Sequence, residues 1–297
     1  MLYFNSAAQY QEVYDCLEAA YDAHIDAFEA QWGHLSEDDY NDMADLLGFV
    51  DEQALINFET SMGVVSYRSW FDGLLQTWMD GYGDPELFPH QNLFGSPVAG
   101  ALHNQHGAVM IAGRIHLVDP LGRRWEFCSC QEYQAYLANP SAYENIEEDD
   151  CVEKPKTTYQ GYGVTCRDHW KNCWWEDIGN SRKVNQTLSF YYGPPANIGW
   201  TEAMAEMRAF KKVWGKWRLR RIKMRVLVHG QDRLPTCAIR GPFDRHKGFR
   251  WCRRIYRIHG WQTHRTFVDN EVKGQYWYTS WSNFHSRQLQ HTYNGCY

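Results

Sequence analysis

The sequence predicts a mixed α+β protein in which an acidic helical part precedes a short hairpin and a basic, mainly β part. The charges are divided unevenly. Residues 1–150 hold 26 Asp and Glu against 4 Lys and Arg, a net of −22, and residues 151–297 hold 10 against 26, a net of +16. The 14 Trp, 19 Tyr and 14 Phe supply enough apolar surface for a sizeable core. No run approaches the roughly 18 consecutive apolar residues of a membrane helix, so no transmembrane segment is expected.

Helices are expected in the first part of the chain. Ser6 and Gln9 have the spacing of a capping box, and the apolar residues that follow recur every three or four positions. Ser36 precedes three acidic residues, in the first helical turn, where the helix dipole favours carboxylates. The expected helices cover residues 6–31, 36–48, 51–61 and 66–79.

A segment rich in Gly and Pro, from Gly81 to Gly100, separates these helices from a β pattern. Residues 108–112 and 115–118 are expected to be short strands of a hairpin, and a turn at Asp119–Gly122 leads to Trp125–Phe127. A short helix is expected at residues 131–137. The charge then changes sign between Glu147 and Lys156, and we place a boundary there.

Beyond this boundary the pattern is mainly β, with strands expected over residues 189–192, 218–228, 250–261 and 276–284. Thr201–Val213 is the exception, because Met204, Met207 and Phe210 recur at helical spacing and predict a helix. We therefore divide the chain into an acidic helical domain, a β-hairpin with its connecting segment, and a basic aromatic-rich β domain. Their bounds are residues 1–97, 98–150 and 151–297.

The strongest candidate for a functional site is a basic region with aromatic residues between its charges. Cations of this kind can hold phosphate or sulfate, and flat rings can stack on bases or sugar faces. The same side chains can instead dock onto the acidic half, contact another copy, or stay solvated. The candidates for polyanion binding or self-association are Lys211, Lys212, Trp214, Lys216, Trp217, Arg218, Arg220, Arg221, Lys223, Arg225, Arg250, Trp251, Arg253 and Arg254.

The nine cysteines favour an oxidising compartment, because a cytosolic chain of this length rarely needs so many. An odd number leaves at least one unpaired, and Cys16, on the apolar side of the first helix, is expected to be a buried free thiol. Cys166 and Cys173 are close enough in sequence to form a small loop. The candidates for disulfide bonds are Cys166, Cys173, Cys237 and Cys252, and their pairing stays open.

Signatures of the common enzyme classes are missing from the sequence. It has no Gly-x-Ser-x-Gly, Walker loop, His-Glu-x-x-His or Gly-x-Gly-x-x-Gly. His103 and His106, with His116 nearby, have a spacing that could hold a metal, but the sequence offers no clear further ligands. We therefore expect a non-enzymatic protein with no catalytic residue, metal or cofactor.

A series of short motifs runs along the chain: Phe4–Tyr10, Leu35–Tyr40, Gly48-Phe49, Ser66–Trp70, the hairpin His106–His116 and the basic region Lys211–Tyr276. In this order they resemble uncharacterised secreted or surface proteins of Bacteroidota, which have a helical N-terminal part and a basic, β-rich C-terminal part. The resemblance implies export to the cell surface and assigns no catalytic residue.

No signal peptide is expected at the start of the sequence, because Met1–Phe4 has neither a basic nor an apolar leader region. A cytoplasmic protein and a mature form whose leader was removed both fit this start, and the cysteines favour the second. An extracellular or cell-surface location is therefore expected.

Two hypotheses of function follow. The first is an exported, non-enzymatic surface or structural protein that assembles with copies of itself, head to tail or in a filament, through its oppositely charged halves. The alternative is a module that binds acidic glycans or nucleic acid through the basic aromatic region. The expected partners are copies of the chain first, then acidic polysaccharide, and nucleic acid last.

Overall fold

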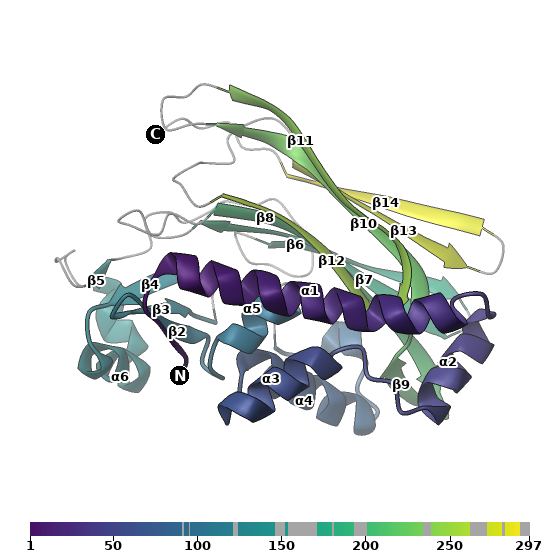
Figure 1. Cartoon of the computed structure of the whole chain (residues 1–297), viewed down its shortest axis with the longest axis horizontal. Coiled ribbons are helices and arrows are strands. Elements are labelled where there is room, and N and C mark those ends of the chain that lie inside the picture. The colour runs from purple at the N-terminus through teal and green to yellow at the C-terminus, as the bar shows by residue number, and fades with distance from the viewer. Residues whose placement is uncertain are drawn as a thin grey trace.

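In the computed structural model of the chain, helices come first and the larger β-sheets follow, which confirms the predicted α+β class (Figure 1). The structure describes residues 1–90, 92–94, 96–120, 124–145, 152–153, 171–179, 181–192, 201–233, 239–261, 272–280 and 283–291. Side chains are described for fewer residues, of which Tyr256 is the last. In the described part of the chain, no helix has the length and apolar character needed to span a bilayer.

The helices begin where the sequence places their caps. The Ser6 hydroxyl accepts a hydrogen bond from the Gln9 N–H, and the Gln9 side chain accepts one from the Asn5 N–H. The Ser36 hydroxyl caps the next helix in the same way. The helices are α1 (Ala7–Trp32), α2 (Glu37–Leu46), α3 (Gln53–Met62), α4 (Tyr67–Asp80), α5 (Pro97–Leu102) and α6 (Cys130–Ala138), with 3-10 turns η1 (Pro85–Leu87) and η2 (Pro140–Asn145).

The described strands form three sheets. The first has the order β1 (Tyr3–Phe4), β2 (Ala108–Ile111), β3 (Arg114–Val118), β4 (Arg124–Phe127) and β5 (Val152–Glu153). The second has the order β11 (Ile239–Cys252), β10 (Ile222–Arg233), β13 (Val272–Ser280) and β14 (Asn283–His291). The third has the order β12 (Arg254–Trp261), β8 (Thr201–Val213), β7 (Arg182–Tyr192) and β6 (Lys171–Gly179), and β9 (Lys216–Leu219) also pairs with β8.

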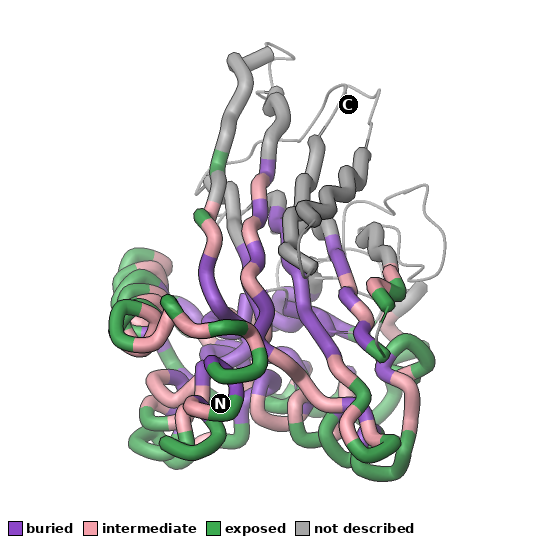
Figure 2. Tube along the Cα trace, turned by 90° about the vertical axis from the view of Figure 1, so that its right-hand side faces the viewer, coloured by how far each residue is buried: buried purple, intermediate pink, exposed green. Residues whose placement is uncertain are grey.

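The third sheet is buried on both faces. One face packs on the second sheet in a cluster that includes Ala205, Met207 and Met224. The other face packs on α4 in a cluster that includes Phe71, Met204 and Phe210. Buried residues accordingly follow the strands where these face the helices, and exposed residues lie on the outer turns of the helices (Figure 2). The basic strands are thus held against the acidic helices.

The predicted helix at Thr201–Val213 is wrong, because this segment is strand β8. Met204 and Phe210 face the helices, whereas Met207 faces the second sheet. These three residues therefore do not share one face, although their spacing of three is typical of a helix. A strand buried on both sides has no polar face, so its pattern cannot be told from that of a buried helix by spacing alone.

The division into three domains stays a prediction. Apolar clusters contain residues from both sides of residue 150: Val118 shares a cluster with Met204, and Tyr256 shares one with Tyr21 of α1. The core therefore joins the helical part to the β part.

Candidate functional site

The opposite charges of the two parts of the chain meet between the helices and the sheets. Carboxylates of α1, α2 and the segments around α3, α4 and η1 lie within ion-pair distance of cations in the β strands. The pairs include Arg182–Glu37, Lys183–Asp84, Lys183–Glu86, Lys211–Asp38, Arg218–Asp80, Arg220–Asp38, Arg221–Asp51, Lys247–Asp22, Arg250–Asp22 and Arg250–Asp26. We call this set the charged interface.

The centre of the charged interface is a buried pair, Arg221 and Asp51. The Arg221 Nε lies 2.7 Å from Asp51 Oδ1, and both side chains are 1% exposed. Arg221 also donates to the Phe49 carbonyl, and the Arg253 N–H donates to Asp51 Oδ2. Asn41 of α2 bonds both the N–H and the carbonyl of Arg221. These contacts bury Arg221, so its guanidinium is unavailable to a polyanion.

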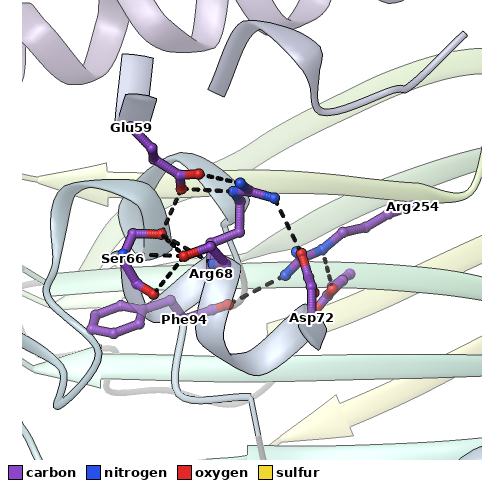
Figure 3. A network of polar contacts seen from close by, with 8 residues as sticks. Glu59, Ser66, Arg68, Asp72, Phe94 and Arg254 are labelled. Carbon is purple, nitrogen blue, oxygen red and sulfur yellow. Dashed lines mark hydrogen bonds and ion pairs between the residues drawn. The ribbon is translucent and has the colours of Figure 1, made fainter. Parts of the chain in front are cut away.

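A second buried network joins α3 to α4 (Figure 3). Arg68 donates to both carboxylate oxygens of Glu59, and Ser66 donates to the same carboxylate. Asp72, one helical turn after Arg68, lies 3.4 Å from its guanidinium. Burial alone would lower the pKa of Arg68, but the hydrogen bond and the charge of Glu59 outweigh it and raise the pKa. The guanidinium therefore stays charged.

Arg254 lies beside this network on β12 (Figure 3). Its guanidinium pairs with Glu206 of β8 and donates to the Phe94 carbonyl. Arg208 pairs with the same Glu206 at 2.6 Å and lies over the Phe71 ring. Arg254 therefore joins β8 of its own sheet to the segment that precedes α5.

Basic residues of β11 contact α1. Asp22 lies 2.6 Å from the Lys247 Nζ and 2.8 Å from the Arg250 guanidinium, which also pairs with Asp26. Burial lowers the pKa of Lys247 despite the attraction of Asp22. Next to them, the Trp251 indole donates to the Gly33 carbonyl. Arg250 and Trp251 are thus positioned by the helical part of the chain.

One part of the basic region faces solvent. β8 and β9 are joined by the two residues Trp214 and Gly215, with φ angles of 53° and 80°. Positive φ at both positions is the geometry of a type I′ hairpin turn, which favours Asn or Gly rather than a bulky residue. Trp214 is nevertheless there and is 96% exposed.

Tyr82, which follows α4, lies at the same place. It too has a positive φ, 66°, and is 65% exposed. Its ring lies 3.6 Å from where a Cβ on Gly215 would stand, and the Lys216 Nζ lies 4.8 Å from the ring centre. Tyr82 therefore packs beside the hairpin turn that carries Trp214, and both residues have positive φ. We call Tyr82, Lys212, Trp214 and Lys216 the aromatic tip.

The two lysines of the aromatic tip lack the ion pairs that hold Lys211, Arg218 and Arg220 nearby. Among the residues whose side chains are described, Lys212 and Lys216 have no carboxylate within 4.0 Å. Lys212 lies 5.7 Å from the ring centre of Trp217, which is buried. Their charge therefore remains available to a partner.

The other predicted residues of the basic region lie apart from the aromatic tip. Lys223 and Arg225 are half-buried on β10, where Arg225 lies over the Phe249 ring. Arg253 is half-buried beyond β11. The structure thus spreads the candidate residues over several faces. Sequence reasoning included Trp214 but missed Tyr82, although a Tyr between Gly81 and Gly83 is a turn signal.

Two expectations about cysteine are wrong. Cys252 is a buried free thiol rather than a disulfide partner, and burial raises the pKa of that thiol. Cys16 is free but exposed rather than buried, because it lies on the outer side of α1. Cys166 and Cys237 lie outside the described residues, and only the backbone of Cys173 is described.

The histidines noted in the sequence serve other contacts. His103 bonds the Ala99 carbonyl and packs 4.2 Å from the Phe94 ring, and His116 lies 3.7 Å from Glu126. In the described part of the chain, no three His, Cys, Asp or Glu side chains are grouped so that they could hold a metal ion.

Comparison with known proteins assigns no function to these residues. No family model and no curated protein matches the chain. Among solved structures, the chain is similar to a DUF4848 family protein from Bacteroides thetaiotaomicron, with 11% identity over 96% of each chain and a TM-score of 0.21. At that score the likeness carries no argument about function.

Proposed function

We propose that the protein is a non-enzymatic, exported surface or structural protein that associates with copies of itself through the aromatic tip. The observation that carries the proposal is Trp214, which is 96% exposed and has a φ of 53°. Such a backbone conformation costs a bulky residue on the order of 1–2 kcal/mol. Exposing so large an apolar side chain to water is a second cost. We infer from these two costs that Trp214 serves a contact with a partner.

Burial of Trp214 at a contact provides the driving force. Burying the roughly 150–250 Å² of a Trp side chain is worth on the order of 4–6 kcal/mol before the costs of association. Trp is also the residue type most enriched among those that dominate binding energy at protein interfaces. Tyr82, which is also exposed, lies beside Gly215 of the same turn and adds apolar surface.

The role of charge in this proposal is narrower than the sequence predicts. The charged interface pairs Lys211, Arg218, Arg220, Arg221 and Arg250 with carboxylates of the helical part of the same chain. Lys212 and Lys216 are left to orient a partner. The location at the cell surface is supported by the resemblance of the sequence motifs to Bacteroidota surface proteins.

Sedimentation velocity over a series of protein concentrations tests the proposal. We expect the wild-type protein to associate, and Trp214→Ala to raise the dissociation constant at least tenfold. Met62→Ala is the matched control, because Met62 is an apolar side chain, 51% exposed, at the end of α3 and not part of the aromatic tip. A wild-type protein that stays monomeric at the highest soluble concentration would overturn the proposal.

A second candidate function is binding of acidic polysaccharide or nucleic acid at the same tip. It is favoured by Lys212 and Lys216, which no described carboxylate pairs, and by the exposed rings of Tyr82 and Trp214 at the same tip. Retention on a heparin column, lost at moderate salt and lost in Lys212→Ala/Lys216→Ala, is its expected result. Unchanged retention of that variant would exclude this site as the binding surface.

A further inference from the structure

We infer that the aromatic tip of one copy docks on the C-terminal end of α2 of a second copy, and that two such contacts close a two-fold dimer. The inference rests on the proposed function, because it names the partner surface of the same tip. It replaces the head-to-tail filament expected from the sequence with a closed assembly.

The surface at the end of α2 is apolar and acidic. Leu46 and Leu47 are 79% and 56% exposed, and Leu46 is, after Trp214, the most exposed large apolar side chain among those described. Asp42 and Asp45 are exposed on the same helix. We call these four residues the α2 patch.

The carboxylates of the α2 patch are weakly engaged within the chain. Asp45 lies 4.0 Å from the nearest guanidinium nitrogens, those of Arg220 and Arg221. Asp42 has no ion pair with any described residue, whereas Asp38, one turn earlier, is held by Lys211 and Arg220. Two carboxylates are therefore left for an outside cation.

The α2 patch and the aromatic tip complement each other. One carries two exposed leucines and two carboxylates, and the other carries two exposed rings and two lysines. Contact of rings with leucines buries apolar surface at the centre, while the charges at the rim fix the orientation. A tip docked on another tip would instead bring lysines against lysines.

The position of the two surfaces determines how the assembly closes. Figure 1 shows α2 and β9 at the same end of the molecule, and the Asp38–Lys211 pair joins α2 directly to β8. When the α2 patch of a second copy binds the tip of the first, the tip of the second copy can therefore bind the α2 patch of the first. Such a reciprocal contact has two-fold symmetry and leaves no free patch for a filament.

Two charge-reversed variants test the inference by mixing. Variant A is Lys212→Glu/Lys216→Glu, and variant B is Asp42→Lys/Asp45→Lys. Each alone sets like charges against each other in both contacts, so we expect monomers in sedimentation velocity. In a mixture, the acidic tip of A meets the basic patch of B, and the basic tip of B meets the acidic patch of A. We therefore expect a one-to-one dimer to return only on mixing.

Controls separate this inference from the proposed function. Lys223→Glu, on β10 away from the tip, should leave association unchanged, and Asp42→Lys alone is used if variant B does not fold. If variants A and B each associate like the wild type while Trp214→Ala does not, the α2 patch is not the partner surface. The proposed role of the aromatic tip in association is then kept. Species larger than a dimer overturn the two-fold closure. A monomeric wild type overturns the proposed function itself.

Discussion

Arg221 and Lys211 show how burial divides the roles of residues that look alike in sequence. Both belong to the basic region, and both pair with a carboxylate of the helical part. Arg221 and Asp51 are each 1% exposed, whereas Asp38, the partner of Lys211, is 55% exposed. Losing a buried partner leaves an uncompensated charge in the core, and losing an exposed partner leaves a solvated one.

The two residues therefore give a paired prediction for stability. Arg221→Met should lower the free energy of unfolding by about 3–5 kcal/mol, because Asp51 is left buried without its cation. Lys211→Ala should lower it by at most about 1 kcal/mol. Urea unfolding at a protein concentration below association measures both values. Equal losses in the two variants would contradict the burial of the Arg221–Asp51 pair.

Glu52 gives a prediction for pH. Its pKa is raised, first by burial and then by the charges of Asp51 and Asp72. A raised pKa means that the folded state holds the proton more tightly than the unfolded state. Protonated Glu52 therefore contributes its full share to the free energy of unfolding below the unfolded pKa near 4.5. This contribution is lost as the pH rises through the higher folded pKa.

Glu52→Gln, which resembles the protonated acid, should therefore stabilise the protein at pH 7. The gain should shrink as the pH falls toward 4.5, because the raised pKa makes wild-type Glu52 take up a proton in the folded state before it does so in the unfolded state. Urea midpoints of the two proteins at pH 7, 6, 5 and 4.5 measure the difference. A gain that is constant over this range, or a loss at pH 7, would refute the shift.

At the scale of elements, the hairpin of β8 and β9 combines a local rule with an exception to it. The two-residue turn and the following strand obey ordinary hairpin geometry, but Trp214 stands where Asn is favoured. Strain kept at an exposed residue is a common mark of a functional position.

Replacing Trp214 by Asn tests this strain directly. Asn tolerates the left-handed conformation, so Trp214→Asn should raise the free energy of unfolding of the monomer by on the order of 1 kcal/mol. The same change should abolish association. Chemical unfolding and sedimentation on one sample report the two effects. A variant that is less stable than wild type would show that the Trp side chain supports the fold rather than a partner.

What the sequence could predict follows from how local each signal is. The capping serines Ser6 and Ser36 act on the next turn of chain, so the helices after them were predictable. β8 was not, because its apolar residues face two different layers that only the tertiary structure brings together.

The aromatic tip was only half predictable for the same reason. Trp214 belongs to the basic region in sequence, but Tyr82 reaches it from the end of α4, more than a hundred residues earlier. Exposure is likewise a property of the folded chain. Arg221 and Trp214 are seven residues apart in a continuous basic stretch, and one is buried while the other is solvated.

At the scale of the whole molecule, the division of charge in the sequence becomes a contact between layers. The acidic helices neutralise the basic strands of the same chain along the charged interface. The aromatic tip and the α2 patch, which we propose as contact surfaces, are exposed outside this interface. Charge complementarity thus organises the fold, and the proposed association uses charges that lie outside this interface.

The central claim is that opposite charges of the two halves pair within one chain, and a double-mutant cycle on Arg182 and Glu37 tests it most directly. Their guanidinium nitrogen and carboxylate oxygen lie 2.7 Å apart, with 5% and 18% of the side chains exposed. We expect Arg182→Met and Glu37→Gln to couple by roughly 0.5–3 kcal/mol in the free energy of unfolding, independent of protein concentration. Additive effects, or a coupling that appears only at concentrations where the protein associates, would contradict the claim.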